Sequence, residues 1–459
     1  MDHGENRGEC ERNSRADTPA LVLIAVADRA CHSYAHRMRA PLRILALLSL
    51  HAHADDWPQF RGANRDAVWN ETGIMQTFPA NGLRIEWRAP VGYGLASPVV
   101  AQGRVYLADS DLAKPKAREN IRCLDAKTGQ PIWTFSHDVA YPEWAFDPNQ
   151  KAGPQATPIV HDGKIYSLGQ MGDLLCLDAI KGAVLWRNNL MTEYGTKEFT
   201  GTTPSPLIEG NLLILPIGAE AGASVVAFEK DTGREAWRAL DDPWTYSSPN
   251  VITAGGQRQF IVWTPASVVS LNPADGKTWW REEVDTNNLY GVATPVVSGD
   301  LLLLSGLMFR LDSAKPAGTI LWPEHRTGSK MVLSTTSIPV IQGGHVFSGK
   351  SNGHLVCLDA RTGKPVWDTD KVTGKAQGAT IHLTPNGGTF LIFTDQGNLI
   401  RARLSADGYK ELSRTHLVDP TYRFAGRNLV WPPPAYANGH IFVHNGAELV
   451  CASLAADGK

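Results

Sequence analysis

One unit recurs along most of this 459-residue chain, and it constrains the fold more than any other feature. Each copy runs from a Ser/Thr-Pro pair through a Gly turn and a strand ending in Leu-Asp to a second turn and a Trp. The plainest copies are residues 97–133, 157–186 and 337–367. Looser copies fill the rest, so that the first strands of the copies begin at residues 98, 158, 206, 249, 295, 339, 380 and 434.

The spacing of these copies indicates the architecture. Successive copies start 41 to 60 residues apart, and each holds four short strand patterns separated by turns. Periods of about 40–50 residues with four strands each are typical of the blades of a β-propeller, not of a helical solenoid. The sequence therefore predicts an all-β fold: an eight-bladed β-propeller of four-stranded antiparallel blades.

The last copy is incomplete, and its missing strand lies at the other end of the chain. Residues 434–453 supply three strand patterns, whereas residues 83–91 resemble a fourth strand with its tryptophan, Trp87. We expect this N-terminal strand to close the last blade, because closure removes the open strand edges of an unfinished ring. The propeller is therefore predicted over residues 83–455.

The recurring acidic residues have a structural explanation. Asp125, Asp178 and Asp359 each open a tight turn, and in two of the three that turn reads Asp-x-x-Thr-Gly. A short polar side chain can bond the turn backbone there, and the Gly supplies a positive φ. We interpret these aspartates as turn residues rather than catalytic acids, because they recur wherever the repeat recurs.

Seven tryptophans share one position in the fourth strand of their copies. A Trp on the outer strand can stack between neighbouring blades, and each would bury about 150–250 Å². The alternative is a ring of ligand-binding tryptophans, for which no common ligand suggests itself. The predicted docking residues are Trp87, Trp133, Trp186, Trp237, Trp280, Trp322 and Trp367.

The first 82 residues differ from the repeat. Residues 1–37 are polar and are interpreted as a non-native upstream extension or a disordered tail. Residues 38–54 combine a basic start, an apolar run and Ala52-His53-Ala54, which is the pattern of a secretory signal peptide. The alternative is a disordered tail followed by a buried apolar segment. We expect export to the periplasm or the medium, with residues 55–82 packing on the ring.

Charge and cysteine content narrow the functions. A formal net charge of −2 gives no reason to expect nucleic acid or an anionic membrane surface as a partner. Cys123, Cys176 and Cys357 all occupy the string Cys-Leu-Asp-Ala, so they are predicted to be buried strand residues rather than disulfide partners. No other segment has the ~20 apolar residues that span a bilayer. No metal-binding or triad motif stands out, and no metal site is predicted.

Two copies carry a resemblance to a known family. CLDAKTGQPIW (residues 123–133) and CLDARTGKPVW (residues 357–367) resemble the tryptophan-docking motif of propellers of the pyrroloquinoline-quinone (PQQ) type. The resemblance covers roughly residues 57–455, and residues 56–66 look like the opening of exported bacterial members, with Trp57 and Phe60 as anchors on the ring. Some members of this family are quinoprotein dehydrogenases that use PQQ and Ca²⁺. Others keep the fold without the cofactor, such as the propeller lipoprotein that assists outer-membrane protein assembly.

The resemblance leaves two functions open. The first is a non-enzymatic binding or scaffold module of the cell envelope, with no cofactor. The second is a PQQ- and Ca²⁺-dependent oxidoreductase acting on alcohols or sugars. The chain has no two adjacent cysteines and no Cys-x-x-Cys-His motif, which are features of the quinoprotein alcohol dehydrogenases, so we favour the first.

A ligand site is expected where the loops precede each first strand. These loops carry aromatic and charged residues, which would suit the binding of an envelope protein or a small molecule. The alternative is that these aromatic residues plug the central channel and brace the loops. The protein is expected to be a monomer. The candidate binding residues are Tyr93, Trp144, Asp147, Tyr194, Trp244, Tyr246, Tyr290, Arg427 and Trp431.

Overall fold

The structure is a computed structural model. It describes residues 56–114, 116–147, 151, 153–196, 203–243, 245–284, 292–304, 306–324 and 337–456. The predicted upstream extension (1–37), the predicted signal peptide (38–54), Trp244 and Tyr290 lie outside this part of the chain. Among the described residues, no helix is long and apolar enough to cross a membrane.

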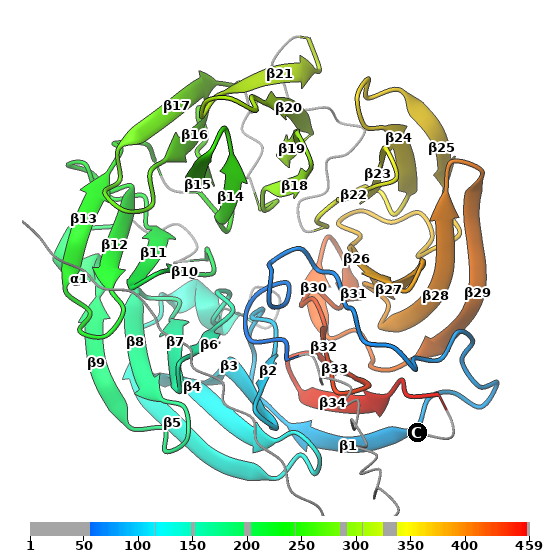
Figure 1. Ribbon diagram of the computed structural model, residues 1–459. Helices are drawn as coiled ribbons and strands as arrows, with labels where there is room; N and C mark the ends of the chain where they lie inside the picture. Colours follow the sequence, from blue (N-terminus) through cyan, green and yellow to red (C-terminus); the bar gives the residue numbers. More distant parts are fainter. Residues whose placement is uncertain are drawn as a thin grey trace, which may run out of the picture. The chain divides into compact units, whose positions relative to one another are not determined.

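Eight four-stranded antiparallel sheets form a ring of blades around a central axis (Figure 1). The predicted propeller is confirmed. From the inner to the outer strand, blade 1 is β2 (Val99–Ala101), β3 (Arg104–Ala113), β4 (Lys116–Asp125) and β5 (Pro131–Val139); blade 2 is β6 (Ile159–His161), β7 (Lys164–Leu168), β8 (Asp173–Asp178) and β9 (Val184–Asn189); blade 3 is β10 (Leu207–Glu209), β11 (Leu212–Pro216), β12 (Val225–Glu229) and β13 (Glu235–Ala239); blade 4 is β14 (Asn250–Ala254), β15 (Gln257–Trp263), β16 (Ser267–Leu271) and β17 (Thr278–Glu283).

The second half of the ring repeats this order. Blade 5 is β18 (Val296–Ser298), β19 (Leu301–Leu304), β20 (Leu307–Leu311) and β21 (Gly318–Trp322); blade 6 is β22 (Val340–Gln342), β23 (His345–Gly349), β24 (Leu355–Asp359) and β25 (Pro365–Thr369); blade 7 is β26 (Ile381–Asn386), β27 (Thr389–Thr394), β28 (Asn398–Ser405) and β29 (Gly408–His416); blade 8 is β32 (Ala435–Ala437), β33 (His440–His444), β34 (Glu448–Ser453) and β1 (Ile85–Pro90). Three short elements lie in the loops: η1 (Glu143–Phe146), α1 (Leu190–Tyr194) and the hairpin β30 (Tyr422–Phe424) with β31 (Arg427–Leu429).

The turn residues act as the sequence suggests. The Asp125 carboxylate accepts hydrogen bonds from the backbone N–H groups of Lys127 and Thr128, at 3.0 and 2.8 Å. Gly129 follows with a φ of 70°, which favours glycine. A β-bulge between Cys123 and Leu124 then re-aims the outer strand, and bulges recur at the equivalent place in the other blades.

Blade 8 joins the two ends of the described chain. Strand β1 pairs antiparallel with β34, with Trp87 opposite Cys451 and Ala89 opposite Leu449. Arg88 also forms an ion pair with Glu448 at 2.8 Å. The predicted closure by an N-terminal strand is therefore confirmed, and β1 covers what would otherwise be the outer edge of the blade (Figure 1).

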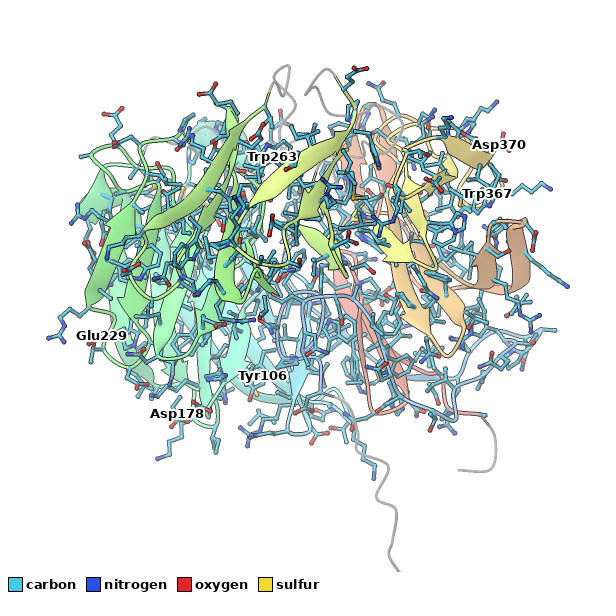
Figure 2. All side chains as sticks on the ribbon, turned by 45° about the horizontal axis from the view of Figure 1, so that its top comes forward. Tyr106, Asp178, Glu229, Trp263, Trp367 and Asp370 are labelled. Carbon is cyan, nitrogen blue, oxygen red and sulfur yellow. The ribbon has the colours of Figure 1, made fainter. Side chains whose placement is uncertain are left out.

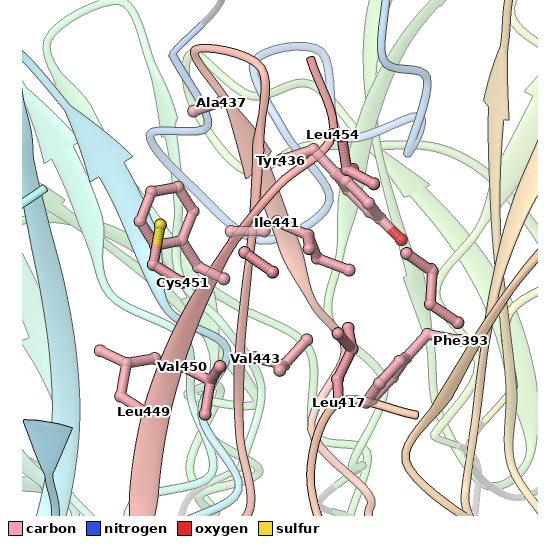
Figure 3. Close-up of a cluster of buried hydrophobic side chains, with 14 of the residues drawn as sticks. Phe393, Leu417, Tyr436, Ala437, Ile441, Val443, Leu449, Val450, Cys451 and Leu454 are labelled. Carbon is pink, nitrogen blue, oxygen red and sulfur yellow. The ribbon is translucent and has the colours of Figure 1, made fainter. Parts of the chain in front are cut away.

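The largest apolar cluster lies around this closure. It joins strands of blades 7 and 8 to the N-terminal segment that precedes β1. Figure 3 shows Phe393 and Leu417 from the blade 7 side facing Tyr436, Ile441 and other side chains of blade 8. Burial of these side chains is favourable by roughly 25 cal/mol for each Å² removed from water. The chain ends are therefore held by a core, and not only by strand pairing.

Candidate functional site

The blades present two different ends. Strand direction alternates within each antiparallel blade. Loops from an outer strand to the next inner strand therefore share one end with the turns between second and third strands. We call this end the loop face and the opposite end the hairpin face. Figure 2 shows Trp263 and Asp370 at the loop face, with Asp178 and Glu229 at the hairpin face.

Tyr93 joins three loops of the loop face. Its ring packs edge-on against Tyr422 of the β30–β31 hairpin, with 5.0 Å between centroids, and the Lys151 ammonium lies 5.8 Å from its centre. The Tyr422 hydroxyl donates to the Gly94 carbonyl. Burial raises the pKa of the Tyr93 phenol above its ordinary value. The loops before blades 1, 2 and 8 thus form one continuous surface.

Arg427 and Trp431 also belong to this surface, but they are engaged within the protein. The Arg427 guanidinium pairs with Asp395, which is fully buried at the end of blade 7. The Trp431 carbonyl accepts from His382 Nε2 at 2.8 Å, and its ring lies 5.1 Å from that of Phe424. Phe424 itself is 41% exposed. The hairpin is therefore anchored at its base and presents an aromatic residue to solvent.

The other predicted loop residues lie apart from the Tyr93 surface or are occupied differently. Trp144 is 37% exposed on the short helix η1. Asp147 caps that helix through its backbone. Tyr194 donates to Glu235 at 2.7 Å and packs on Phe228, so it braces blades 2 and 3. Tyr246 is half-buried in the loop before blade 4.

The tryptophans of the outer strands reach into the next blade. Trp186 of blade 2 donates its indole N–H to the Lys230 carbonyl of blade 3 at 3.0 Å, and its ring lies against Gly233. Equivalent bonds run from Trp87 to Ala126, Trp133 to Ala179, Trp237 to Pro273, Trp322 to Ala360 and Trp367 to Ser405. Trp280 differs, because its indole bonds Gln259 inside its own blade.

The N-terminal segment lies across the central opening (Figure 1). Trp57 pairs with Val100 of the innermost strand of blade 1 through two backbone bonds of 2.8 and 2.9 Å. Arg65 reaches the far side, where it donates to the carbonyls of Pro206 at 2.9 Å and Pro249 at 3.0 Å. Trp69 returns to blade 7 through the Pro385 carbonyl. We call residues 57–69 the plug.

Two buried arginines of the plug were not among the predicted site residues. Arg61 and Arg65 are 6% and 3% exposed, and their φ angles are 63° and 56°. Burial lowers their pKa values to about 10 and about 9, so both remain charged at neutral pH. A cavity of about 30 Å³ is lined by Arg61, Trp57 and His382, among other residues. The signal available in the sequence was the pair of arginines in an otherwise anchoring segment.

The described residues do not fit PQQ and Ca²⁺. No group of three His, Cys, Asp or Glu side chains among them could hold a metal ion. Buried carboxylates of the loop face already have partners within the protein: Asp173 pairs with Arg187 at 2.7 Å, Asp242 pairs with Arg281 at 2.6 Å, and Glu119 accepts from the Tyr141 hydroxyl at 2.6 Å. No oxidation step is therefore derived from these residues.

The chain is similar in sequence to known proteins. A family model described as outer membrane protein assembly factor BamB matches residues 117–314 and 308–411. The chain belongs to this family. A BamB from Moranella endobia is 27% identical over 46% of this chain and 56% of its own length. The quinohemoprotein alcohol dehydrogenase of Comamonas testosteroni is 24% identical over 68% of this chain and 46% of its own. The chain thus spans about half the length of these two relatives.

The solved structure of that Comamonas dehydrogenase is similar with a TM-score of 0.62. The alignment covers 88% of this chain and 81% of the other, at 14% sequence identity. This likeness shows a shared propeller fold. It carries no conclusion about chemistry, because the same fold supports unrelated functions.

Proposed function

We propose that this protein is an exported, non-enzymatic binding module of the cell envelope that presents its loop face to another envelope protein. Membership of the family described as outer membrane protein assembly factor BamB supports this proposal. Export through residues 38–54 would place the propeller in the periplasm. The protein acts as a monomer, and its partner is a protein rather than nucleic acid.

The main structural support for a binding surface is the β30–β31 hairpin. It is an addition to the repeat, since no other described blade connection contains a two-stranded sheet. Its base is fixed by Tyr422 on Gly94 and by Arg427 on Asp395, while Phe424 remains 41% exposed. A rigidly held, exposed aromatic residue loses little entropy on binding and is typical of an interface anchor.

Trp144 is a second exposed aromatic residue of the loop face. It stands on η1, in the same loop as Lys151, which contacts Tyr93. The Trp144 ring is 37% exposed. Two exposed aromatic residues in loops of the same face are suited to an extended or hairpin segment of a partner, and the Lys151 ammonium beside Tyr93 is suited to an acidic residue of that segment.

Photo-crosslinking from the loop face tests the proposal. A crosslinking amino acid at position 424 should trap one envelope protein in cells, and Phe424→Ala should reduce its co-purification about tenfold or more, in line with a hot-spot loss of ~1.4 kcal/mol or above. Position 366 is the matched control, because Val366 is 42% exposed on the outer strand β25. Identical products from positions 424 and 366 would contradict the proposal.

The alternative is a PQQ-dependent oxidoreductase of alcohols or sugars. The similarity to the Comamonas dehydrogenase favours testing it. Purified protein titrated with PQQ and Ca²⁺ should retain no quinone absorbance and reduce no dye with alcohols or sugars. Retention of the quinone together with dye reduction would replace the binding module by the enzyme.

A further inference from the structure

We propose that a chloride ion is bound beside the plug, in the cavity that Arg61 and Trp57 line. This inference is independent of the proposed envelope partner. It rests on one cavity, on two lining residues that each have an unpaired N–H donor, and on a buried guanidinium with no carboxylate at ion-pair distance among the described residues.

The donors come first. Arg61 Nη1 and Trp57 Nε1 are both buried, and neither has a hydrogen-bond partner. Both residues line the same cavity. A buried polar group left unpaired destabilises the folded state, and more so when it is charged. Two unpaired donors on residues that line one small space are suited to a shared acceptor in that space.

The charge of the plug decides what kind of acceptor fits. Among the described residues, no carboxylate lies within 4.0 Å of the Arg61 or Arg65 guanidinium. Arg65 is compensated by carbonyl oxygens, but Arg61 has only the Asp66 carbonyl, at 3.2 Å. Asp66 itself is exposed, and its carboxylate accepts the Val68 N–H at 2.9 Å. A water molecule would supply a hydrogen-bond acceptor but would leave the Arg61 charge uncompensated. An anion supplies both an acceptor and a compensating negative charge.

The size and walls of the cavity select a monatomic anion. Its volume of about 30 Å³ exceeds the ~10–15 Å³ that one water molecule needs, but leaves no room for a multi-oxygen anion or a peptide. The remaining walls are largely apolar and include Ile338, Leu383 and Pro434. His382 cannot compete for the ion, because its Nε2 already donates to the Trp431 carbonyl at 2.8 Å.

Bromide, which replaces chloride and scatters anomalously, gives a direct test on the wild-type protein. Crystals soaked in sodium bromide should show an anomalous peak within hydrogen-bond distance of Arg61 Nη1 and Trp57 Nε1. A water molecule at that place, with no bromide peak, would overturn the proposal.

Thermal stability supplies a second readout. Replacing sodium gluconate by sodium chloride at equal ionic strength should raise the melting temperature by about 2–4 °C. Trp57→Phe should shift the chloride midpoint to about tenfold higher concentration, and Arg61→Met should abolish the effect. Arg84→Gln is the matched control, because the Arg84 side chain is 73% exposed. Equal stabilisation by gluconate and chloride, or an unchanged response in both plug variants, would contradict the proposal.

Discussion

At position 233 the repeat requires a glycine for steric reasons. A Cβ there would come within 2.7 Å of the Trp186 ring, and the residue has a φ of 72°. The glycines at 129, 182, 276 and 363 meet the tryptophan of the preceding blade in the same way. The Gly-x-x-x-Trp spacing therefore pairs the turn glycine of these five blades with the tryptophan of the preceding blade.

A matched pair of alanine variants isolates this contact. Gly233→Ala should lower the free energy of unfolding by about 1–3 kcal/mol more than Gly210→Ala, because of overpacking against the indole. Gly210 has a similar φ of 61° but nothing within 4 Å of an added Cβ. Trp186→Ala should cost about 3–5 kcal/mol. Urea unfolding measures all three, and equal losses at 233 and 210 would rule out the docking role.

His444 links blade 8 to the loop before blade 1. Its Nε2 donates to the Ala96 carbonyl at 2.7 Å, and burial lowers the pKa of the imidazole to about 4. The unfolded chain, with a histidine pKa of about 6.5, binds more protons between these values, so stability falls as the pH falls from 6.5 to 4.

The size of this effect can be measured. Between pH 7 and pH 5, His444 should reduce the free energy of unfolding by roughly 2 kcal/mol. His444→Gln keeps an N–H donor for Ala96 but cannot titrate. Its stability should therefore fall less over the same interval, and parallel pH profiles for the two proteins would contradict the assignment.

At the scale of elements, strand β1 has a role that no other strand shares. It closes blade 8 from the opposite end of the chain, and Trp87 on it also bonds Ala126 of blade 1. Without β1, the edge of β34 and the buried residues Leu449, Val450 and Cys451 would face solvent. An exposed apolar edge of this kind pairs readily with other chains.

A truncation makes this role testable. A chain beginning at Asp56 should be monomeric and melt in one transition, whereas a chain beginning at Val91 should aggregate or melt at least ~3 °C lower, for a loss of ~3 kcal/mol or more. Light scattering and calorimetry compare the two. A monomeric, equally stable protein from Val91 would show that the ring does not need its closing strand.

The sequence was informative about elements because the repeat is local. The spacing of glycine and tryptophan gave seven docking positions, and six of them bond the next blade. Trp280 departs from the pattern because the following turn, Asp312 to Gly318, is two residues longer than the equivalent turn from Asp359 to Gly363. Arg65 could not be assigned in this way, because its acceptors Pro206 and Pro249 lie 141 and 184 residues away.

The predicted loop residues show the same limit. Aromatic residues at the loop face were visible in the sequence, but their partners were not. Tyr194 turned out to brace two blades, and the Tyr93 contact with Tyr422 joins segments more than three hundred residues apart. A single sequence contains no local pattern that reports such contacts.

As a whole molecule, the ring distributes its stability over successive blade interfaces. Four cysteines can be used to monitor the unfolding of the ring. They are free and buried, and they lie in the third strands of blades 1, 2, 6 and 8: Cys123, Cys176, Cys357 and Cys451. Burial raises the pKa of each thiol, to about 11 for the first three, which disfavours the reactive thiolate.

These thiols should react only when the ring opens. Pulsed alkylation across a urea series, read by mass spectrometry, should give one common midpoint for all four cysteines if the blades unfold as one unit. That midpoint should coincide with the loss of tryptophan fluorescence. A lower midpoint for Cys451 than for Cys176 would show instead that the ring opens first at its closure.

The closure also fixes a waiting time during synthesis. Arg88 on β1 meets Glu448, which follows it by 360 residues. At about 5–20 residues per second, the first strand waits roughly 20–70 s before its partner has been made. Until then, the most recently completed blade has a neighbouring blade on one side only. A nascent chain of this kind needs protection of its apolar first strand until the last few residues arrive.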